Sequence, residues 1–459
     1  MLRCRASLPR SLATLAALAP LMVLSTSPAA GENWPAWRGP WGTGVTSETD
    51  LPLAWSRTQG VKWRVALPEP GNSTPIVWDD RVLLTQPITG DNLRTLVCLD
   101  REDGKQLWRA EVVHADKEPT HPTNPYCSAS PATDGQRVVA WFGAAGLHAY
   151  DLDGGKLWQR DDLEAPTHEW GYGASPILSG ELCIVAVGPG PDEFVIAVDK
   201  HSGQTVWKWG VPAPEVDGAP EEVGEVGPPE ADAQQRERAR TLRGSWSTPL
   251  VIRVPERDEL IVLTPLRVSG LEPRSGRLLW TCRGLGPLVY ASPIWGDQVL
   301  VALGGYHSAS LAVRPGGSGD VTANRRLWHQ PRSPLRLGTG IIHEGHLYLH
   351  DMRGIAQCLD LASGEEVWAR RLAGGGDRSG SWSSMILSGD RIYVLNQSAD
   401  TFVFRAAPQF KQLAVNSLGE PTNSSLAVSR GELFIRTHEG LWCIAASATD
   451  LPADAATTR

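Results

Sequence analysis

The sequence lacks a hydrophobic run long enough to cross a membrane. Its longest apolar stretch, Leu12–Leu24, is shorter than the ~20 residues of a spanning helix, and no later segment approaches that length. Because Arg3, Arg5 and Arg10 precede this stretch and Ser27–Ala30 follows it, residues 1–30 are expected to be a secretory signal peptide. No cysteine lies at the end of that segment, so the exported chain is expected to be periplasmic or secreted and not lipid-anchored.

Cysteine is scarce, and no two cysteines are adjacent. The chain has 7, of which six follow the expected signal peptide. Cys98, Cys358 and Cys443 occupy a position of a repeated unit at which other copies have alanine. Equivalent positions in different units are expected to lie beyond the ~7 Å limit for a disulfide, so we predict free, buried thiols there. The same argument leaves the state of Cys127, Cys183 and Cys282 open.

Basic residues and the common catalytic motifs are also under-represented. Lysine and arginine together number 43 against 51 acidic residues, so nucleic acids and anionic lipid surfaces are poor partners. The sequence has no phosphate loop, nucleophile elbow or zinc signature, and no catalytic residue is predicted. His343, His346 and His350 fall on a predicted hairpin without an accompanying carboxylate pattern, so we expect no metal there.

The chain does contain a repeated unit in which a turn with Asp and Gly leads into a strand that carries tryptophan. Clear copies end at Trp108, Trp158, Trp207, Trp280 and Trp368, and a degenerate copy ends at Trp328. Repetition at a period of roughly 40–50 residues indicates a propeller, a solenoid or an array. Each unit has short strands bounded by turn residues and almost no helical periodicity, which predicts four antiparallel strands, the composition of a propeller blade.

Counting the units predicts an all-β, eight-bladed β-propeller. Their first strands are expected to begin near Ser73, Ser128, Ser175, Ser247, Ser292, Gly338, Ser383 and Ser424. Seven blades is the alternative, because the last two units are weak and Leu413 stands about where a tryptophan would fall. The eighth unit has no fourth strand after Cys443. We expect the N-terminal segment Val61–Leu67 to supply it and so to close the ring without an exposed edge.

Two recurring side chains of the unit are predicted to be structural. The glycine of each turn takes the positive φ that the hairpin needs, and each tryptophan packs its large apolar surface on the neighbouring blade. The predicted docking tryptophans are Trp63, Trp108, Trp158, Trp207, Trp280, Trp328 and Trp368.

The remaining segments divide the chain. Residues 31–52 form a Trp/Pro-rich N-terminal segment whose Trp34, Trp37 and Trp41 are expected to pack against the propeller of residues 53–446. Within the propeller, residues 211–243 form an acidic insertion between blades that we expect to be disordered. Residues 447–459 are expected to be a flexible tail, and the protein is expected to be monomeric.

Residues just before each first strand are predicted to surround the mouth of the central channel, on the face that carries the long loops. The predicted funnel consists of Tyr126, Trp170, Tyr172, Trp246, Tyr290, Arg336, Trp382 and Asn423. Such ring faces with a few polar groups suit a planar ligand, a sugar or an extended peptide. The alternative is that the aromatic rings only pack beneath the loops. Charge at the rim is expected from His168, Glu169, Arg336, Asp377 and Arg378.

The pattern Ala-x-Asp-x-x-(Thr/Ser)-Gly-x-x-x-Trp resembles the tryptophan-docking repeat of pyrroloquinoline-quinone (PQQ)-like β-propellers. The resemblance covers roughly Leu53–Ala446, and Asn33–Gly42 is similar to the leader of many secreted bacterial PQQ-like repeat proteins. That superfamily includes quinoprotein dehydrogenases and the non-catalytic lipoprotein of the outer-membrane β-barrel assembly machine. Because the shared motif holds blades together, the resemblance implies a fold and transfers no catalytic residue.

Two functions follow as expectations. The first is an exported, non-catalytic propeller without a cofactor that binds a protein or a carbohydrate of the cell envelope. The alternative is a quinoprotein dehydrogenase that holds PQQ and calcium in the funnel, with Glu169, Asp377 and Asn423 as candidate ligands or base. The sequence departs from the dehydrogenases because it is shorter and has neither their vicinal disulfide nor their calcium and base motifs. We therefore predict the binding function.

Overall fold

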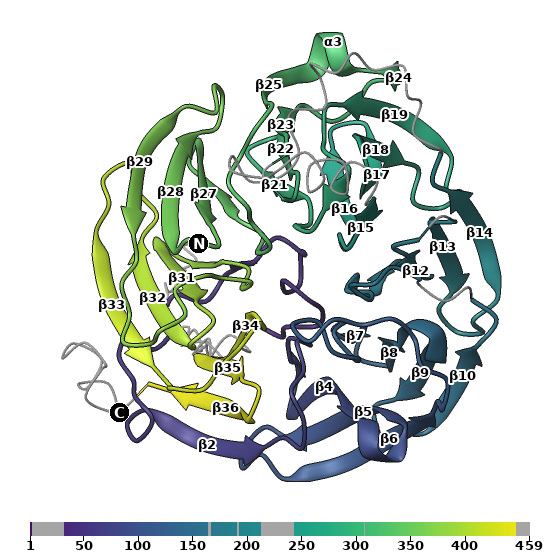
Figure 1. Cartoon of the computed structure of the whole chain (residues 1–459), viewed down its shortest axis with the longest axis vertical. Helices are drawn as coiled ribbons and strands as arrows, with labels where there is room; N and C mark the ends of the chain where they lie inside the picture. The colour runs from purple at the N-terminus through teal and green to yellow at the C-terminus, as the bar shows by residue number, and fades with distance from the viewer. Residues whose placement is uncertain (2–31, 164–166, 191, 213–242, 307, 447–459) are drawn as a thin grey trace. The chain divides into compact units, whose positions relative to one another are not determined.

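Eight antiparallel sheets follow one another around a ring in the computed structural model (Figure 1). The structure describes residues 1, 32–163, 167–190, 192–212, 243–306 and 308–446. The predicted eight-bladed β-propeller is thereby confirmed, and the seven-bladed alternative is wrong. The expected signal peptide beyond Met1, residues 213–242 of the acidic insertion and the tail 447–459 lie outside the described residues.

Each blade has a core of four strands, ordered from the first, innermost strand to the outer edge. Blades 1 to 4 consist of β3 (Ile76–Trp78), β4 (Arg81–Ile88), β5 (Leu93–Asp100) and β6 (Gln106–Val113); β7 (Ala132–Thr133), β8 (Arg137–Trp141), β9 (Leu147–Asp151) and β10 (Lys156–Arg160); β11 (Ile177–Ser179), β12 (Leu182–Val187), β13 (Phe194–Asp199) and β14 (Thr205–Gly210); and β16 (Leu250–Val254), β17 (Arg257–Thr264), β18 (Arg267–Leu271) and β19 (Leu278–Arg283).

The other half of the ring repeats this order. Blades 5 to 8 consist of β21 (Ile294–Gly296), β22 (Val299–Leu303), β23 (Ser310–Val313) and β25 (Arg326–Gln330); β26 (Ile341–His343), β27 (His346–His350), β28 (Ile355–Asp360) and β29 (Glu366–Arg371); β30 (Ile386–Ser388), β31 (Arg391–Leu395), β32 (Asp400–Arg405) and β33 (Gln412–Ser417); and β34 (Leu426–Ser429), β35 (Glu432–Arg436), β36 (Gly440–Ala445) and β2 (Val61–Ala66).

A few short elements lie outside this scheme. Strand β1 (Val45–Thr46) runs parallel to β30, β24 (Gly319–Asp320) runs parallel to β19, and β15 (Gly244–Ser245) pairs with β20 (Leu288–Val289). The described helical elements are the 3-10 turns η1 (Thr89–Asp91) and η2 (Gly143–Ala145) and the helix α3 (Thr322–Arg325). No described helix has the length and apolar character needed to span a membrane.

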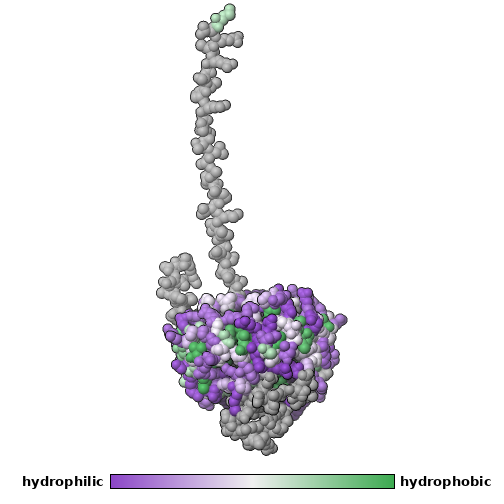
Figure 2. Space-filling model, turned by 90° about the horizontal axis from the view of Figure 1, so that it is seen from above, coloured by the Kyte–Doolittle hydropathy of each residue, from purple (hydrophilic) through white to green (hydrophobic). Residues whose placement is uncertain are grey.

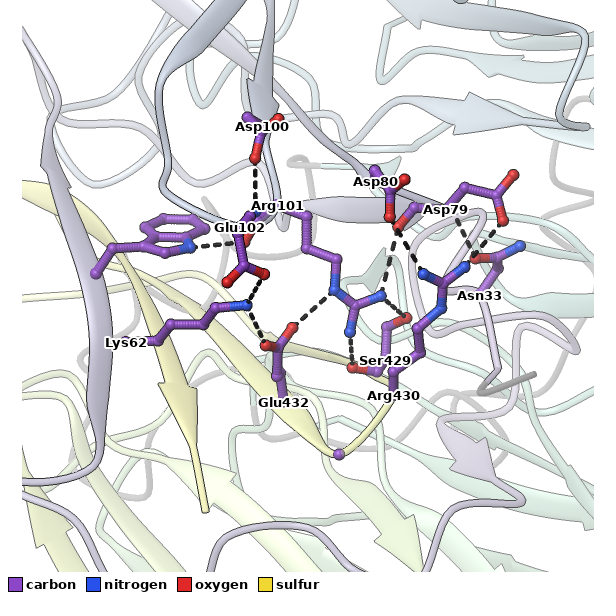
Figure 3. A network of polar contacts seen from close by, with 12 residues as sticks. Asn33, Lys62, Asp79, Asp80, Asp100, Arg101, Glu102, Ser429, Arg430 and Glu432 are labelled. Atoms are coloured by element: carbon purple, nitrogen blue, oxygen red, sulfur yellow. Dashed lines mark hydrogen bonds and ion pairs between the residues drawn. The ribbon is translucent and has the colours of Figure 1, made fainter. Parts of the chain in front are cut away.

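The ring closes in blade 8, where the two ends of the propeller meet. Strand β2 pairs antiparallel with β36, with Trp63 opposite Cys443, so the purple and yellow strands of Figure 1 share one sheet. This confirms the predicted closure by an N-terminal strand. At the seam with blade 1, the Arg101 guanidinium donates from Nε to Glu432 over 2.7 Å and from Nη1 to Ser429 over 3.2 Å (Figure 3). Lys62 Nζ lies 2.9 Å from the same Glu432 carboxylate.

The hydrophobic core lies between adjacent blades. One cluster, for example, joins Val139 and Trp141 of blade 2 to Val185, Phe194 and Ile196 of blade 3. The six cysteines after residue 30 are free thiols and all are buried. Burial raises their pKa values, to about 12 for Cys98 and Cys183, so these thiols act as small apolar side chains.

Six of the seven predicted docking tryptophans contact the next blade in the same way. Each donates its indole N–H over 2.7–3.0 Å to a carbonyl in the turn between the third and fourth strands of the next blade; the pairs are Trp63–Arg101, Trp108–Leu152, Trp158–Lys200, Trp207–Pro273, Trp328–Leu361 and Trp368–Ala407. Glycine is required in five of these turns because a Cβ atom would collide with the indole; at Gly104 it would come within 2.8 Å of Trp63. The tryptophan and the glycine of the repeat therefore contact each other across the blade boundary.

Trp280 belongs to a core cluster with Leu300 and Leu311 of the next blade but differs from the other six in its hydrogen bond. It is fully buried and donates its indole N–H over 2.7 Å to Glu259, a residue of its own blade. The reason lies in blade 5, where residues 314–325, including β24 and α3, replace the tight turn that would accept the bond. The backbone N–H of Gly316 in this longer connection also donates to Glu259, over 3.2 Å.

The N-terminal segment crosses the inner strands near the middle of the ring, where it is the purple trace of Figure 1. Trp34 is fully buried and exchanges two 2.8 Å backbone hydrogen bonds with Val77 of β3. Arg38, 3% exposed, donates to the carbonyls of Thr339 over 3.1 Å and Gly340 over 2.9 Å at the start of β26. The segment thus connects blade 1 to blade 6.

The expectation that all three tryptophans of this segment pack against the propeller is wrong for Trp41. Its side chain is 67% exposed. Trp41 lies in a tight turn in which the N–H of Gly42 donates to the carbonyl of Gly39, and both glycines have positive φ. The turn directs the indole into solvent.

The outer surface is largely polar. In the view of Figure 2 the described surface is mostly hydrophilic, with small, separate hydrophobic patches. Four of the exposed aliphatic side chains, Leu107, Leu157, Val206 and Val367, each directly precede a docking tryptophan. Because successive side chains of a strand face opposite sides, the residue before each inward-facing tryptophan faces outward.

Candidate functional site

A cavity of about 370 Å³ lies in the central channel. Residues from all eight blades line it, and most of them belong to the chain just before a first strand. Two rings of side chains, two residues apart in sequence, organise this lining.

The first ring consists of eight hydroxyl side chains. The backbone N–H of each member donates over 2.9–3.1 Å to the hydroxyl oxygen of the member in the next blade, and the eighth donates to the first. The members of this hydroxyl ring are Thr74, Ser130, Ser175, Thr248, Ser292, Thr339, Ser384 and Ser425. It joins the inner strands of neighbouring blades around the whole channel. Five members line the cavity: Thr74, Ser130, Ser175, Thr248 and Ser425.

The second ring lies two residues earlier in each blade. Its members, which we call the lining ring, are Asn72, Ser128, Gly173, Trp246, Tyr290, Leu337, Trp382 and Asn423, and all eight line the cavity. In an extended chain, residues two apart face the same side. The hydroxyl ring therefore fixes the direction in which the lining ring projects.

The aromatic part of the wall comes from blades 3 to 5. The Trp246 ring lies 5.4 Å from Tyr290 and 5.8 Å from Trp170, and Trp170 lies 6.4 Å from Tyr306 (centroid distances). His168 packs edge-on against Trp246 at 4.8 Å, and burial lowers the pKa of its imidazole below the ordinary value. These rings form one continuous aromatic cluster.

The polar part of the wall comes from blades 8, 1 and 2. Asn72 and Asn423 both donate from Nδ2 to the carbonyl of Thr123, over 2.9 and 3.1 Å. Asn124 in turn donates to the carbonyls of Trp170 and Tyr172 over 2.7 and 2.9 Å. Side-chain amides thus hold the loop after blade 1 against its neighbours on both sides of the cavity.

Trp37 of the N-terminal segment also lines the cavity. The backbone contacts of this segment with Val77 and Thr133 lie at the ends of the first strands, three residues beyond the hydroxyl ring. Trp37 therefore reaches the channel from the side opposite the lining ring.

Five of the eight predicted funnel residues line the cavity and three do not. Trp170, Trp246, Tyr290, Trp382 and Asn423 belong to its lining, whereas Tyr126, Tyr172 and Arg336 are absent from it. The strand period explains two of the exceptions. Tyr172 and Arg336 stand three residues before the hydroxyl ring and so face away from the channel, each 3% exposed.

The three corrected residues have other partners. Tyr126 covers the buried Arg94–Glu118 pair, with the Arg94 guanidinium 3.7 Å from the ring centroid. Tyr172 packs edge-on against Trp141 at 6.1 Å. Arg336 donates to Gln357, and burial lowers the pKa of its guanidinium to about 10.

Among the residues that the structure describes, the cavity lining carries no carboxylate and no lysine or arginine. The charges expected at the rim lie outside it, because none of His168, Glu169, Arg336, Asp377 and Arg378 belongs to the lining. The lining combines aromatic rings, amides, hydroxyls, aliphatic side chains and the single imidazole of His121.

This donor set does not fit PQQ with calcium. Calcium prefers several oxygen ligands that include carboxylates, and PQQ is itself a tricarboxylic acid that needs opposite charge when desolvated. The lining offers neither, and the described residues contain no group of three or more His, Cys, Asp or Glu placed to hold a metal ion. Of the residues suggested for that role, only Asn423 lines the cavity.

Glu193 lies behind the aromatic cluster and gives the site a pH dependence. It accepts hydrogen bonds from the backbone N–H groups of Gly190 and Ser245, both over 3.3 Å, next to Trp246. Burial raises the pKa of this carboxyl from 4.5 to about 7. The folded state therefore holds its proton more tightly than the unfolded state does.

We expect the replacement Glu193→Gln to remove part of the pH dependence of stability. A raised folded-state pKa stabilises the protein fully below about pH 4.5, and this contribution is lost as the pH rises through about 7. Wild type should thus lose up to about 3 kcal/mol relative to the variant between pH 5 and pH 8. Urea unfolding of both proteins at the two pH values measures this difference, and equal losses in both proteins would contradict it.

The sequence analysis did not predict the hydroxyl ring, nor that the residue two positions before each of its members lines the cavity. The signal was present, since serine or threonine occurs just before the first strand of every unit. If that serine or threonine is taken as the reference position, the residue two positions before it is predicted to face the channel. Ser128, Gly173 and Leu337 would have been found in this way.

Comparison with known proteins agrees with the fold. The family model of the outer membrane protein assembly factor BamB matches residues 43–167, 88–236 and 230–370, which together cover more than half of the chain. No curated protein sequence matches the chain. BamB from Moraxella catarrhalis is similar in structure, with a TM-score of 0.55 and 14% identity over 84% of this chain and 96% of that one.

Two further solved structures share the architecture. The quinohemoprotein alcohol dehydrogenase from Comamonas testosteroni gives a TM-score of 0.66 with 11% identity over 91% of this chain and 81% of that one. The computationally designed Ika8 protein gives a TM-score of 0.52 with 10% identity over 84% of this chain and 99% of that one. At these identities the structures show the fold alone. The sequence match and the repeat structure together show that the chain belongs to the BamB-like family of PQQ-like β-propellers.

Proposed function

We propose that this protein is an exported, non-catalytic β-propeller that binds a protein or a carbohydrate of the cell envelope through its central cavity and the surrounding loops. The observation that supports this most is the composition of the cavity lining. Its described residues provide stacking surfaces and neutral hydrogen-bonding groups, and they include no carboxylate that would act as a base and no Lys or Arg that would bind an anionic cofactor.

The family match supports the same proposal. Its model is described as that of the outer membrane protein assembly factor BamB, and we infer a binding role of the same kind for this chain. The predicted signal peptide supports export. The alternative, a PQQ- and calcium-dependent dehydrogenase, draws on the aromatic cluster, which would suit the plane of a quinone.

A titration with PQQ and calcium separates the two functions. We expect no saturable quenching of tryptophan fluorescence and no reduction of a redox dye with alcohols or aldoses, because the lining has no charge to bind the cofactor. A PQQ-dependent alcohol dehydrogenase, treated in parallel, verifies the reagents. Saturable quenching that disappears in Trp382→Ala, together with dye reduction, would overturn the proposal.

A further inference from the structure

The cavity has two chemically different sides. In the lining ring, Trp246, Tyr290 and Trp382 come from blades 4, 5 and 7, whereas Asn423, Asn72 and Ser128 come from blades 8, 1 and 2. The three aromatic side chains are only partly buried, so part of each contributes to the cavity surface. A ligand that fills this space must therefore present an apolar face to one side and polar groups to the other.

The ligand must also be neutral. None of the described residues that line the cavity is an aspartate, glutamate, lysine or arginine. An ionised group that entered would lose its hydration without gaining a counter-charge, which is costly. This argues against phosphates, carboxylic acids and free amines as occupants.

Hydrogen-bonding capacity narrows the choice further. Asn72 uses its Nδ2 on the carbonyl of Thr123, which leaves its buried Oδ1 without a donor. Lining members of the hydroxyl ring such as Ser130 and Ser175 each accept one backbone N–H and keep a hydrogen to donate. On the polar side of the cavity, Asn72 Oδ1 can accept a hydrogen bond and the ring hydroxyls can donate one. Ligand hydroxyl groups match this pattern because each can both donate and accept.

We infer that the cavity binds a neutral mono- or disaccharide, an inference that rests on the proposed binding function. The C–H face of a sugar ring stacks on Trp382, and its hydroxyl groups point to Asn72 and the hydroxyl ring. The cavity volume of about 370 Å³ lies at the lower end of the range for small-molecule sites, which suits a ligand of this size.

The test begins with an array of neutral glycans and continues with calorimetric titration of the best ligand. We expect saturable binding that weakens about ten-fold or more in Trp382→Ala, because the stacking surface is removed, and that Trp382→Phe largely retains. Trp41→Ala is the matched control, since this indole is 67% exposed and does not line the cavity. It should leave the affinity unchanged.

The other probes distinguish failure of the inference from failure of the proposed function. If no glycan binds but an end-capped neutral peptide binds and loses affinity in Trp382→Ala, the saccharide is wrong and the binding function stands. Equal affinity for oligogalacturonate and for its neutral counterpart would overturn the requirement for neutrality. If no glycan of the array binds, the inference is also overturned, whereas binding of PQQ with calcium would overturn the proposed function itself.

Discussion

Replacement of Arg101 by methionine is expected to lower the free energy of unfolding by about 1.5–3 kcal/mol, because the buried Glu432 carboxylate loses its guanidinium partner and keeps only the Lys62 ammonium, 2.9 Å away, among its ion pairs. Arg101 is 6% exposed and joins blade 1 to Glu432 and Ser429 of blade 8 (Figure 3). Leu152 occupies the equivalent turn position in blade 2, within a continuous chain. Blade 8 continues into blade 1 only through β2, whereas its strands β34–β36 come from the other end of the chain, so side chains of this kind connect those strands to blade 1. Urea unfolding measures the change.

Arg430 provides the matched control at the same seam. Its guanidinium lies 3.0 Å from Asp79 and 3.3 Å from Asp80, but these carboxylates are 58% and 83% exposed. Solvent screens such pairs, so Arg430→Met should cost about 0–1 kcal/mol. Equal costs for the two variants would show that burial of the Arg101 network does not hold the ring closed.

Replacement of Arg38 by methionine is expected to detach the N-terminal segment from the channel. Arg38 donates to carbonyls of Thr339 and Gly340 in blade 6 and over 3.5 Å to that of Met385 in blade 7, and burial lowers the pKa of its guanidinium to about 9. Each buried carbonyl left without a donor costs about 1–3 kcal/mol. Amide hydrogen exchange across residues 33–46 should therefore accelerate about 100-fold or more, while the outer strands keep their protection.

Two results decide this prediction. Trp41→Ala changes the same segment at an exposed side chain and should leave its exchange unchanged. If Arg38→Met accelerates exchange uniformly through the propeller, the arginine stabilises the whole ring and does not act as a local anchor. Unchanged exchange at residues 33–46 would mean that Trp34 and β1 suffice to hold the segment.

The fold was predictable because its signals are local and repeated. A turn glycine and a tryptophan about four residues later recur with the period of a blade. The turn glycine contacts the tryptophan of the preceding blade at five of the eight blade boundaries, as Gly104 contacts Trp63. The last unit lacks a fourth strand and the segment Val61–Leu67 has no blade before it, so the closure of the ring by this segment could be predicted. Where the repeat changes, less could be predicted. The degenerate unit that ends at Trp328 indicates an irregular turn in the next blade, but not that Glu259 accepts the indole N–H of Trp280 in its place.

The site was less predictable because aromatic residues alone do not define a direction. Tyr172 and Trp246 both precede first strands, yet one stands three and the other two residues before the hydroxyl ring, and this single position separates a core side chain from a channel side chain. The sidedness of the cavity depends on which blades face each other across the channel. That information becomes available only once the ring is closed.

The hydroxyl ring separates the width of the channel from its chemistry. Eight hydrogen bonds of nearly equal length, one per blade, fix the width of the channel. That width therefore depends on the number of blades and on a hydroxyl side chain at one position in each blade. The side chains two residues earlier take no part in that ring and can change without altering it. Substitutions at the eight positions of the lining ring can therefore change what an eight-bladed propeller binds without changing the hydroxyl ring or the width of the channel.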